Sequence, residues 1–262
     1  MTVGKPTSPD APALEATARR GVFWRLLSLQ ASWNDQRMQN LGLLACLAPW
    51  LNRQELSSQQ VRSCCRRYFG YFNTNPYLAG FVVGGLLHLE HARAAGRPVS
   101  ERDVSGFRDT LARVCGALGD QILWLGLRPG VMLLACGLAA LGRWQLVLAL
   151  VALVTLAQLW LRWRSLAMGF RLGADVVDVL NRPLWRHAVV WSRRVGLSLT
   201  GLLIGVYFAS GFGLGETVGT GRFLGLTLLG FALPALVRQK TSAEAQLLLS
   251  LPIVWLLVAA TA

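Results

Sequence analysis

Five runs of apolar residues in the second half of the chain constrain its fold more than any other feature. Their ranges are 131–142, 144–161, 195–213, 223–237 and 246–260. A helix needs about 17–25 residues to cross a bilayer, and only 144–161 and 195–213 reach that length comfortably. The stretch from 130 to 161 is too long for one crossing, so we expect a bend at Gly142 and Arg143.

The composition is that of a membrane protein. Apolar residues make up 53% of the 262 residues and charged residues 15%, and the mean hydropathy is +0.44. Soluble domains carry about 25% charged residues. We therefore predict an all-α integral membrane protein with several transmembrane helices. The shorter apolar pieces 41–51 and 78–89 predict helices that are re-entrant, interfacial or buried in protein, and 54–68 predicts an amphipathic surface helix.

The basic residues predict how the chain lies in the membrane. The net charge is +13, but the arginines flank apolar runs and do not gather in one patch with aromatic residues, which argues against a nucleic-acid partner. Seven arginines fall in 162–194, whereas 211–221 has Glu216 as its one charged residue. By the positive-inside rule, 162–194 and the N-terminus are cytoplasmic and 211–221 is outside.

The sequence gives no sign of catalysis, of a cofactor or of a metal site. The five cysteines show no C-x-x-C spacing, so we expect them to be reduced. No P-loop, Rossmann, G-x-S-x-G or H-E-x-x-H pattern occurs. Residues 1–20 are rich in Pro, Ala and Thr and contain no apolar segment. They predict a disordered cytoplasmic tail and not a cleaved signal peptide.

Small polar residues stand directly ahead of the apolar run that begins at Leu78. Asn73, Thr74 and Asn75 carry donors and acceptors without charge, and Pro76 marks a break in the backbone. Irregular backbone at membrane depth survives where it is buried in protein or lines a cavity, as in transporter substrate sites. The same residue types also form helix N-caps and turns, and the two roles can coexist.

An acidic residue, Asp120, lies inside an apolar block. Intramembrane carboxylates are costly unless paired, so Asp120 is either a functional group or the partner of Arg128 in a structural ion pair. Glycine pairs at four-residue spacing, such as Gly80/Gly84, Gly126/Gly130 and Gly169/Gly173, are typical of closely packed membrane helices.

Four blocks of sequence resemble, in order, the IID component of mannose/fructose/sorbose-type phosphotransferase permeases. They are QASWNDQRMQNLG at 30–42, FNTNPYLAG with LHLEHARAAG within 72–96, GALGDQILWLGLRP at 116–129 and MGFRLGADVV at 168–177. The resemblance implies a core at 21–130 and a helical membrane region at 131–262, the latter with the basic segment 162–194.

The resemblance also implies a function and partners. Family members pair with a IIC membrane subunit as a hetero-oligomer in the bacterial inner membrane, in contact with lipid, and the pair conducts a hexose. Cytoplasmic IIA and IIB proteins carry the phosphate that the sugar receives. This multi-pass chain would then be a non-catalytic transport subunit, with no phosphate-carrying histidine of its own.

The matched blocks imply two groups of site residues. Those expected at the substrate are Asn73, Thr74, Asn75, Trp33 and Asn34. Those expected to hold the surrounding structure, including a turn at 119–120, are Gly119, Asp120, Arg128, Pro129, Arg37 and Glu90. Trp33 either stacks on a sugar face or lies at the membrane interface or in protein. For Glu90 we expect an ion pair with Arg93, with metal ligation or helix capping as alternatives.

Several positions depart from the family pattern. Gln36 and His91 replace acidic residues, Arg113 replaces a glycine in a Met-Gly-Pro sequence, and Ala117 replaces the first glycine of a G-x-G-D turn. The alternative hypothesis is therefore a divergent IID-like regulatory or scaffold subunit without efficient sugar transport. A third reading is an unrelated channel or membrane enzyme.

Overall fold

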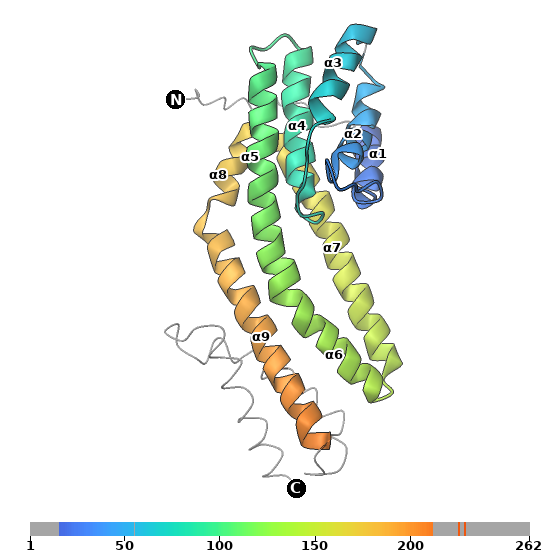
Figure 1. Cartoon of the computed structure of the whole chain (residues 1–262), viewed down its shortest axis with the longest axis vertical. Helices are drawn as coiled ribbons and strands as arrows, with labels where there is room; N and C mark the ends of the chain where they lie inside the picture. The colour runs from blue at the N-terminus through green and yellow to red at the C-terminus, as the bar shows by residue number, and fades with distance from the viewer. Residues whose placement is uncertain (1–15, 55, 212–224, 226–227, 229–262) are drawn as a thin grey trace. The chain divides into compact units, whose positions relative to one another are not determined.

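The computed structural model describes residues 16–54 and 56–211, together with 225 and 228 (Figure 1). In these residues every regular element is helical, and the extended pairing consists of two isolated bridges, which confirms the all-α prediction. The elements are α1 (Ala16–Leu27), α2 (Asn40–Leu51), α3 (Ser58–Tyr68), α4 (Ala79–Ala94), α5 (Glu101–Gly119), η1 (Asp120–Leu127), α6 (Arg128–Ala140), α7 (Trp144–Leu172), η2 (Gly173–Asp175), α8 (Val176–Leu180) and α9 (Pro183–Gly211).

Among the residues that the structure describes, two continuous helical stretches are long and apolar enough to cross a membrane. They are Glu101–Ala140, which joins α5, η1 and α6, and Trp144–Leu180, which contains the predicted run 144–161. Between them Gly142 has a φ of +69°, a backbone conformation that glycine adopts without strain, so the expected bend is confirmed. The run 195–213 falls in α9 as far as Gly211, and the last two runs lie outside the described residues apart from 225 and 228.

The chain forms two compact units, and each contains two separate stretches of sequence. Unit 1 contains the described residues up to Ala117 together with Gln158–Asn181. Unit 2 contains Leu118–Ala157 and the described residues from Arg182 onward. The chain thus leaves unit 1 near the end of α5 and returns to it within α7. The family resemblance implies a different division, into a core at 21–130 and a membrane region at 131–262, and this division stays a prediction.

In unit 1, α4 is buried in protein along most of its length. All residues from Ala79 to Leu87 are buried, so this piece is a core helix of the unit and not an exposed interfacial helix. Around it, α1 packs on α2, and α2 contacts α3 and α4. The core includes Val22, Leu26, Leu43, Leu47 and Leu86, each at most 1% exposed.

Glycines bring α4 against the second half of α7. A Cβ atom at Gly80 would lie 2.6 Å from the Leu166 nitrogen, and one at Gly84 would lie 2.6 Å from the Phe170 nitrogen. From the other side, a Cβ at Gly169 would lie 2.5 Å from the Phe81 carbonyl oxygen. No larger side chain fits between these backbones, so the predicted packing role of these glycines is confirmed.

Unit 2 uses the same kind of contact between η1, α6 and α9. Gly126 and Gly196 meet backbone to backbone, and a Cβ at Gly130 would lie 3.1 Å from the Leu199 side chain. Further along, Leu134 and Leu138 of α6 form an apolar cluster with Leu202 and Leu203 of α9. The glycines permit the close approach and the leucines fill the space beyond it.

Two local predictions at the N-terminal side have clear outcomes. Residues 16–20 belong to α1, so the predicted disordered tail is wrong for these five; residues 1–15 lie outside the described part. Ala18 is 2% exposed, and its burial favours the helix. The amphipathic helix expected at 54–68 is α3, which begins at Ser58 behind a capping box of Ser57 and Gln60.

Candidate functional site

Two of the family blocks lie side by side in unit 1 and form a pair of loops. We name residues 30–39 the Trp33 loop and residues 69–78 the Asn73 loop. Met38 forms a parallel bridge with Phe72. The Gln39 N–H donates to the Phe72 carbonyl over 2.8 Å, and the Phe72 N–H donates to the Arg37 carbonyl over 3.3 Å. Segments far apart in sequence are thus joined through their backbones.

The Gln39 side chain holds Thr74 from both sides. Its amide nitrogen donates to the Thr74 carbonyl over 2.9 Å, and its amide oxygen accepts from the Thr74 N–H over 3.1 Å. Both residues are buried, at 1% and 5% exposure. The Thr74 hydroxyl donates to the Ala112 carbonyl of α5 over 3.0 Å. Thr74 therefore fixes the loop, and its hydroxyl proton is committed to the protein.

The next three residues of the Asn73 loop lead into α4. The Asn75 side-chain oxygen accepts from the Tyr77 N–H over 3.0 Å, and the Asn75 carbonyl accepts from the Ala79 N–H over 2.9 Å. Arg162 of α7 donates to the Pro76 carbonyl over 3.2 Å, and its guanidinium lies 4.4 Å from the Tyr77 ring centroid. Asn75 therefore has the turn-forming role that we weighed as an alternative to substrate contact.

Asn73 differs from its neighbours because its side chain is exposed. It forms no hydrogen bond with any residue that the structure describes. Its backbone nonetheless lies between Phe72, which pairs with the Trp33 loop, and Thr74, which Gln39 holds. An amide with free donors and acceptors is thus presented from a fixed backbone, which suits hydrogen bonding to a polar ligand.

In the Trp33 loop, Trp33 and Asn34 have different surroundings. Trp33 is 51% exposed, so much of its indole ring is available for contact. The Asn34 side chain is engaged: its oxygen accepts from the Arg37 N–H over 2.8 Å, and its nitrogen donates to the Asn40 side chain over 3.1 Å. Asn34 therefore shapes the loop, in which Met38 adopts a positive φ of 55°.

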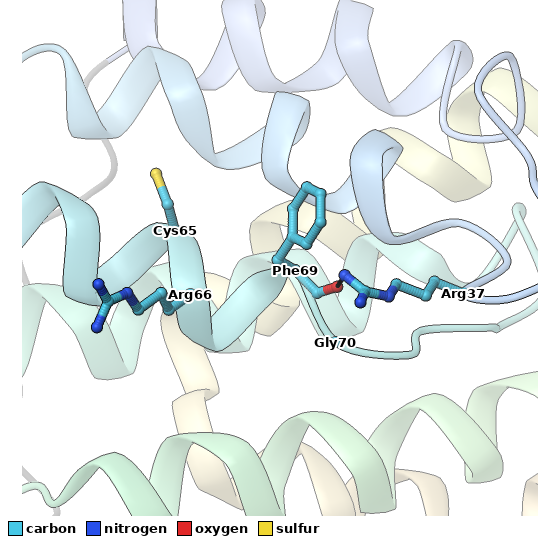
Figure 2. Close-up of a pocket in the computed structure, with 5 residues that line it drawn as sticks. All are labelled: Arg37, Cys65, Arg66, Phe69 and Gly70. Atoms are coloured by element: carbon cyan, nitrogen blue, oxygen red, sulfur yellow. Dashed lines mark hydrogen bonds between the residues drawn. The ribbon is translucent and has the colours of Figure 1, made fainter.

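Arg37 lines a shallow hollow of about 500 Å³ beside the Asn73 loop (Figure 2). Its guanidinium donates to the Phe69 carbonyl over 3.2 Å and lies 4.9 Å from the Phe69 ring centroid. Asn40 donates to the same carbonyl over 3.0 Å. The other lining residues are Cys65, Arg66 and Gly70. Arg37 thus joins the two loops, as the structural role expected for it requires.

Glu90 is the acceptor of a buried polar network, and the partner we expected for it is wrong. Its carboxylate binds Arg67 of α3, with the two Nη2–oxygen distances 3.0 and 3.2 Å, and the Tyr68 hydroxyl donates to it over 2.8 Å. Arg93 instead faces Glu101 over 3.4 Å, and Arg67 also contacts Glu101. Glu90 is 5% exposed, and such burial requires a fully satisfied carboxylate.

This network perturbs the acid–base behaviour of its neighbours on α3. Burial, followed by the adjacent Glu90 charge, raises the pKa of Tyr68 well above that of an ordinary phenol. The same two causes, in the same order, raise the pKa of the Cys64 thiol to about 12. Both groups stay protonated and neutral at physiological pH.

The third family block begins at the end of α5 and lies mostly in unit 2, and the turn expected there is absent. Gly119 ends α5 and Asp120 begins η1, a wide-turn π-helix that continues the same helical stretch. Pro129 is the second residue of α6, and because η1 runs directly into α6, its missing N–H removes one backbone donor from this helical stretch. The Arg128 guanidinium lies 4.2 Å from the Trp124 ring centroid. That Asp120 and Arg128 hold a loop beside the substrate cavity stays a prediction.

Sequence reasoning missed three contributors to the loop pair. Gln39 was part of a matched block but had no assigned role, and nothing in the sequence pairs it with Thr74. The Ala112 carbonyl is a backbone group and has no sequence signal. Arg162 was counted only as part of the basic segment, although an arginine placed within a run of apolar residues is itself a sign of a specific partner.

Comparison with known proteins identifies the family. The sequence model of the mannose/fructose/sorbose family IID component of phosphotransferase systems matches residues 13–247. The chain belongs to this family. The resemblance seen in the four blocks is thus confirmed.

Curated relatives agree with this assignment. The mannose-specific EIID component of Escherichia coli K12 is 31% identical over 186 residues, which cover 71% of this chain and 66% of the relative. The sorbose-specific EIID component of Lacticaseibacillus casei is 28% identical over 175 residues, covering 67% of this chain and 62% of the relative. The chain thus matches slightly less than two thirds of the length of these relatives.

Solved structures share the fold of this IID component. A chain from the cryo-EM structure of the mannose transporter ManYZ with microcin E492 is similar with a TM-score of 0.59 and 25% identity. The match covers 95% of this chain and 97% of that chain. A chain from another solved structure, described as a membrane protein, has a TM-score of 0.65 at 24% identity, and it supports the fold alone.

Proposed function

We propose that this chain acts with a IIC subunit to carry a hexose across the bacterial inner membrane, and that IIA and IIB partners phosphorylate the sugar. It would be a multi-pass protein with its N-terminus in the cytoplasm. Membership of the IID family and the fold shared with a chain of the ManYZ structure support the assembly with IIC. No catalytic group is assigned to this chain.

The observation that carries the proposal is the exposed Asn73 side chain on a fixed loop. Its neighbour Thr74 is bound by Gln39 and by the Ala112 carbonyl, so the Asn73 backbone is held before any ligand arrives. Preorganised donors lose less entropy on binding than mobile ones. An uncharged amide can both donate to and accept from sugar hydroxyls, which suits a neutral substrate that must also be released.

The remaining motif residues have supporting roles in this proposal. Thr74 and Asn75 shape the Asn73 loop, and Asn34 shapes the Trp33 loop. Trp33 offers an exposed ring that can stack on the apolar face of a pyranose. Asp120 and Arg128 would hold their own segment around residues 119–129, and the basic segment 162–194 would meet cytoplasmic partners.

The test is reconstitution with the IIC partner in proteoliposomes, with IIA, IIB and phosphoenolpyruvate supplied, and uptake measured for a panel of hexoses. We expect uptake of at least one hexose. Asn73→Ala should lower that uptake about tenfold while the IID–IIC complex stays intact, because about one substrate hydrogen bond is lost. Asn52→Ala removes another exposed asparagine at the end of α2 and should leave uptake unchanged.

The regulatory alternative makes a different prediction in the same experiment. The departures from the family pattern at Gln36, Arg113 and Ala117 are all at exposed positions, so they alter surface and not core packing. A scaffold would form the complex with IIC or IIB yet give no phosphoenolpyruvate-dependent sugar phosphorylation. Normal uptake by Asn73→Ala would instead remove Asn73 from the substrate site and leave the transport role intact.

A further inference from the structure

The hollow lined by Arg37, Cys65, Arg66, Phe69 and Gly70 has no role in the function proposed above. We name it the Phe69 hollow. We propose that it is a binding site for a phosphate group, with Arg37 as a fixed donor and Arg66 as a second cation that closes on the ligand. The phosphate would come from a small phosphate ester in solution or from a phospholipid headgroup.

Arg37 is held in place by contacts that do not include a carboxylate among the described residues, so its positive charge is not neutralised by an ion pair there. One guanidinium nitrogen donates to the Phe69 carbonyl and the group stacks on the Phe69 ring, but it forms no ion pair with any described residue. Its remaining N–H groups are therefore available. A planar guanidinium with several parallel N–H groups matches phosphate oxygens better than an ammonium does.

Arg66 supplies a second cation and is not fixed. It is exposed and forms no hydrogen bond or ion pair with the part of the chain that the structure describes. In Figure 2, Arg37 and Arg66 lie on either side of Phe69, with the Arg66 side chain extending away from the ring. A long, unpartnered arginine on the last turn of α3 can rotate toward an anion that Arg37 holds.

Phe69 indicates which kind of phosphate-bearing molecule fits the hollow. Phe69 is 45% exposed among the residues that line the hollow, so its ring offers an apolar face to a ligand. The volume of about 500 Å³ lies in the range of small-molecule sites, about 300–1,000 Å³. A phosphate carried on a sugar ring or on a glycerol backbone would cover the phenyl face, whereas free phosphate would leave it in contact with water.

Cys65 provides a direct reporter because its side chain lines the same hollow. The experiment follows the alkylation of each cysteine by N-ethylmaleimide, by peptide mass spectrometry, in the purified full chain in detergent. The soluble probes are inorganic phosphate and glucose 6-phosphate, with glucose and sodium chloride of equal ionic strength as controls. A second arm compares nanodiscs of phosphatidylglycerol with nanodiscs of phosphatidylcholine. Cys136, which is exposed in unit 2, is the internal reference.

We expect a phosphate-bearing probe to slow Cys65 alkylation at least about threefold at concentrations above its dissociation constant, with Cys136 unaffected. Protection by glucose 6-phosphate identifies a soluble ester, and protection confined to phosphatidylglycerol identifies a headgroup. Arg37→Gln and Arg66→Gln should each remove the protection. Arg62→Gln, an exposed arginine one turn earlier on α3 that does not line the hollow, should keep it.

The outcomes that overturn the proposal are equally specific. They are no protection by any phosphate-bearing probe or by phosphatidylglycerol, equal protection by sodium chloride, or full protection in Arg66→Gln. Because Arg66 forms no hydrogen bond or ion pair with another described residue, that variant should fold even where Arg37→Gln perturbs the loops. The readout is independent of uptake, so it stands or falls separately from the transport function.

Discussion

The side-chain amide of Gln39 binds both backbone groups of Thr74, donating over 2.9 Å and accepting over 3.1 Å. These two hydrogen bonds satisfy the backbone N–H and C=O of Thr74, as a neighbouring β-strand would in a sheet. It couples the Trp33 loop to the Asn73 loop, so a change in one loop alters the other. Four predictions test this arrangement and the packing that supports it.

Replacing Gln39 should destabilise unit 1. Gln39→Ala leaves the N–H and C=O of Thr74 buried without partners, which should lower the free energy of unfolding by about 2–4 kcal/mol. Thermal unfolding of the purified chain in detergent measures the change. Gln36→Ala, an exposed change in the same loop, should stay within about 0.5 kcal/mol of the original chain. If Gln39→Ala were as stable as Gln36→Ala, water would be forming the hydrogen bonds to Thr74 in place of the Gln39 side chain.

Removing the charge of Glu90 should be among the most damaging single changes on α4. Glu90→Gln removes the buried carboxylate of Arg67 and leaves its guanidinium with the half-exposed Glu101 alone as an ion-pair partner among the described residues, which should cost about 3–5 kcal/mol. Glu101→Gln, which removes a carboxylate that also contacts Arg67 but is 53% exposed, should cost about 1 kcal/mol or less. Urea unfolding of the two variants gives the comparison. Similar losses would mean that Glu90 is better solvated than its burial indicates.

The raised pKa of Tyr68 predicts loss of stability in alkali. The folded chain keeps the Tyr68 proton at a pH where the unfolded chain releases it, near pH 10, so the unfolded state binds fewer protons. The contribution of Tyr68 to stability should be constant below about pH 9 and should fall as the pH rises above about 10. Tyr68→Phe removes this contribution, so its unfolding free energy should decline less between those values. If the unfolding free energies of Tyr68→Phe and of the original chain declined equally with pH, the raised pKa of Tyr68 would be refuted.

Alanine substitutions at two glycines should change the free energy of unfolding in opposite directions. Gly84→Ala places a methyl group against the backbone of α7 and should destabilise the chain by about 1–3 kcal/mol. Gly106→Ala, within α5, meets nothing within 4 Å and should stabilise it by about 0.5–1 kcal/mol. Melting temperatures in the same detergent test both. Destabilisation by both would contradict the open surroundings of Gly106.

Features encoded by local pattern were predictable from the sequence. The bend at Gly142 follows from the length of the apolar stretch, and α3 follows from its amphipathic pattern. The glycine contacts of Gly80 and Gly84 follow from their spacing. In each case the residues that carry the signal are also the ones that form the structure.

Features that depend on which helices meet were not predictable. Glu90 pairs with Arg67 from another helix, although Arg93 lies three residues away on its own helix. The turn expected at Gly119 is helical here, in keeping with the helix-forming Ala112 and Arg113 at the positions of the family's Met-Gly-Pro. Of the predicted substrate residues, only the structure distinguishes the exposed Asn73 from the engaged Thr74.

Unit 1 contains two segments that are separated in the sequence, and this has a consequence for biosynthesis. The ribosome delivers α4, with its bare glycine face, well before the stretch from Gln158 onward that covers it. Until that stretch emerges, the nascent polypeptide holds an unshielded backbone surface that lipid, the insertion machinery or a chaperone must screen. Stop codons placed between the two segments should therefore yield products that quality-control proteases clear rapidly.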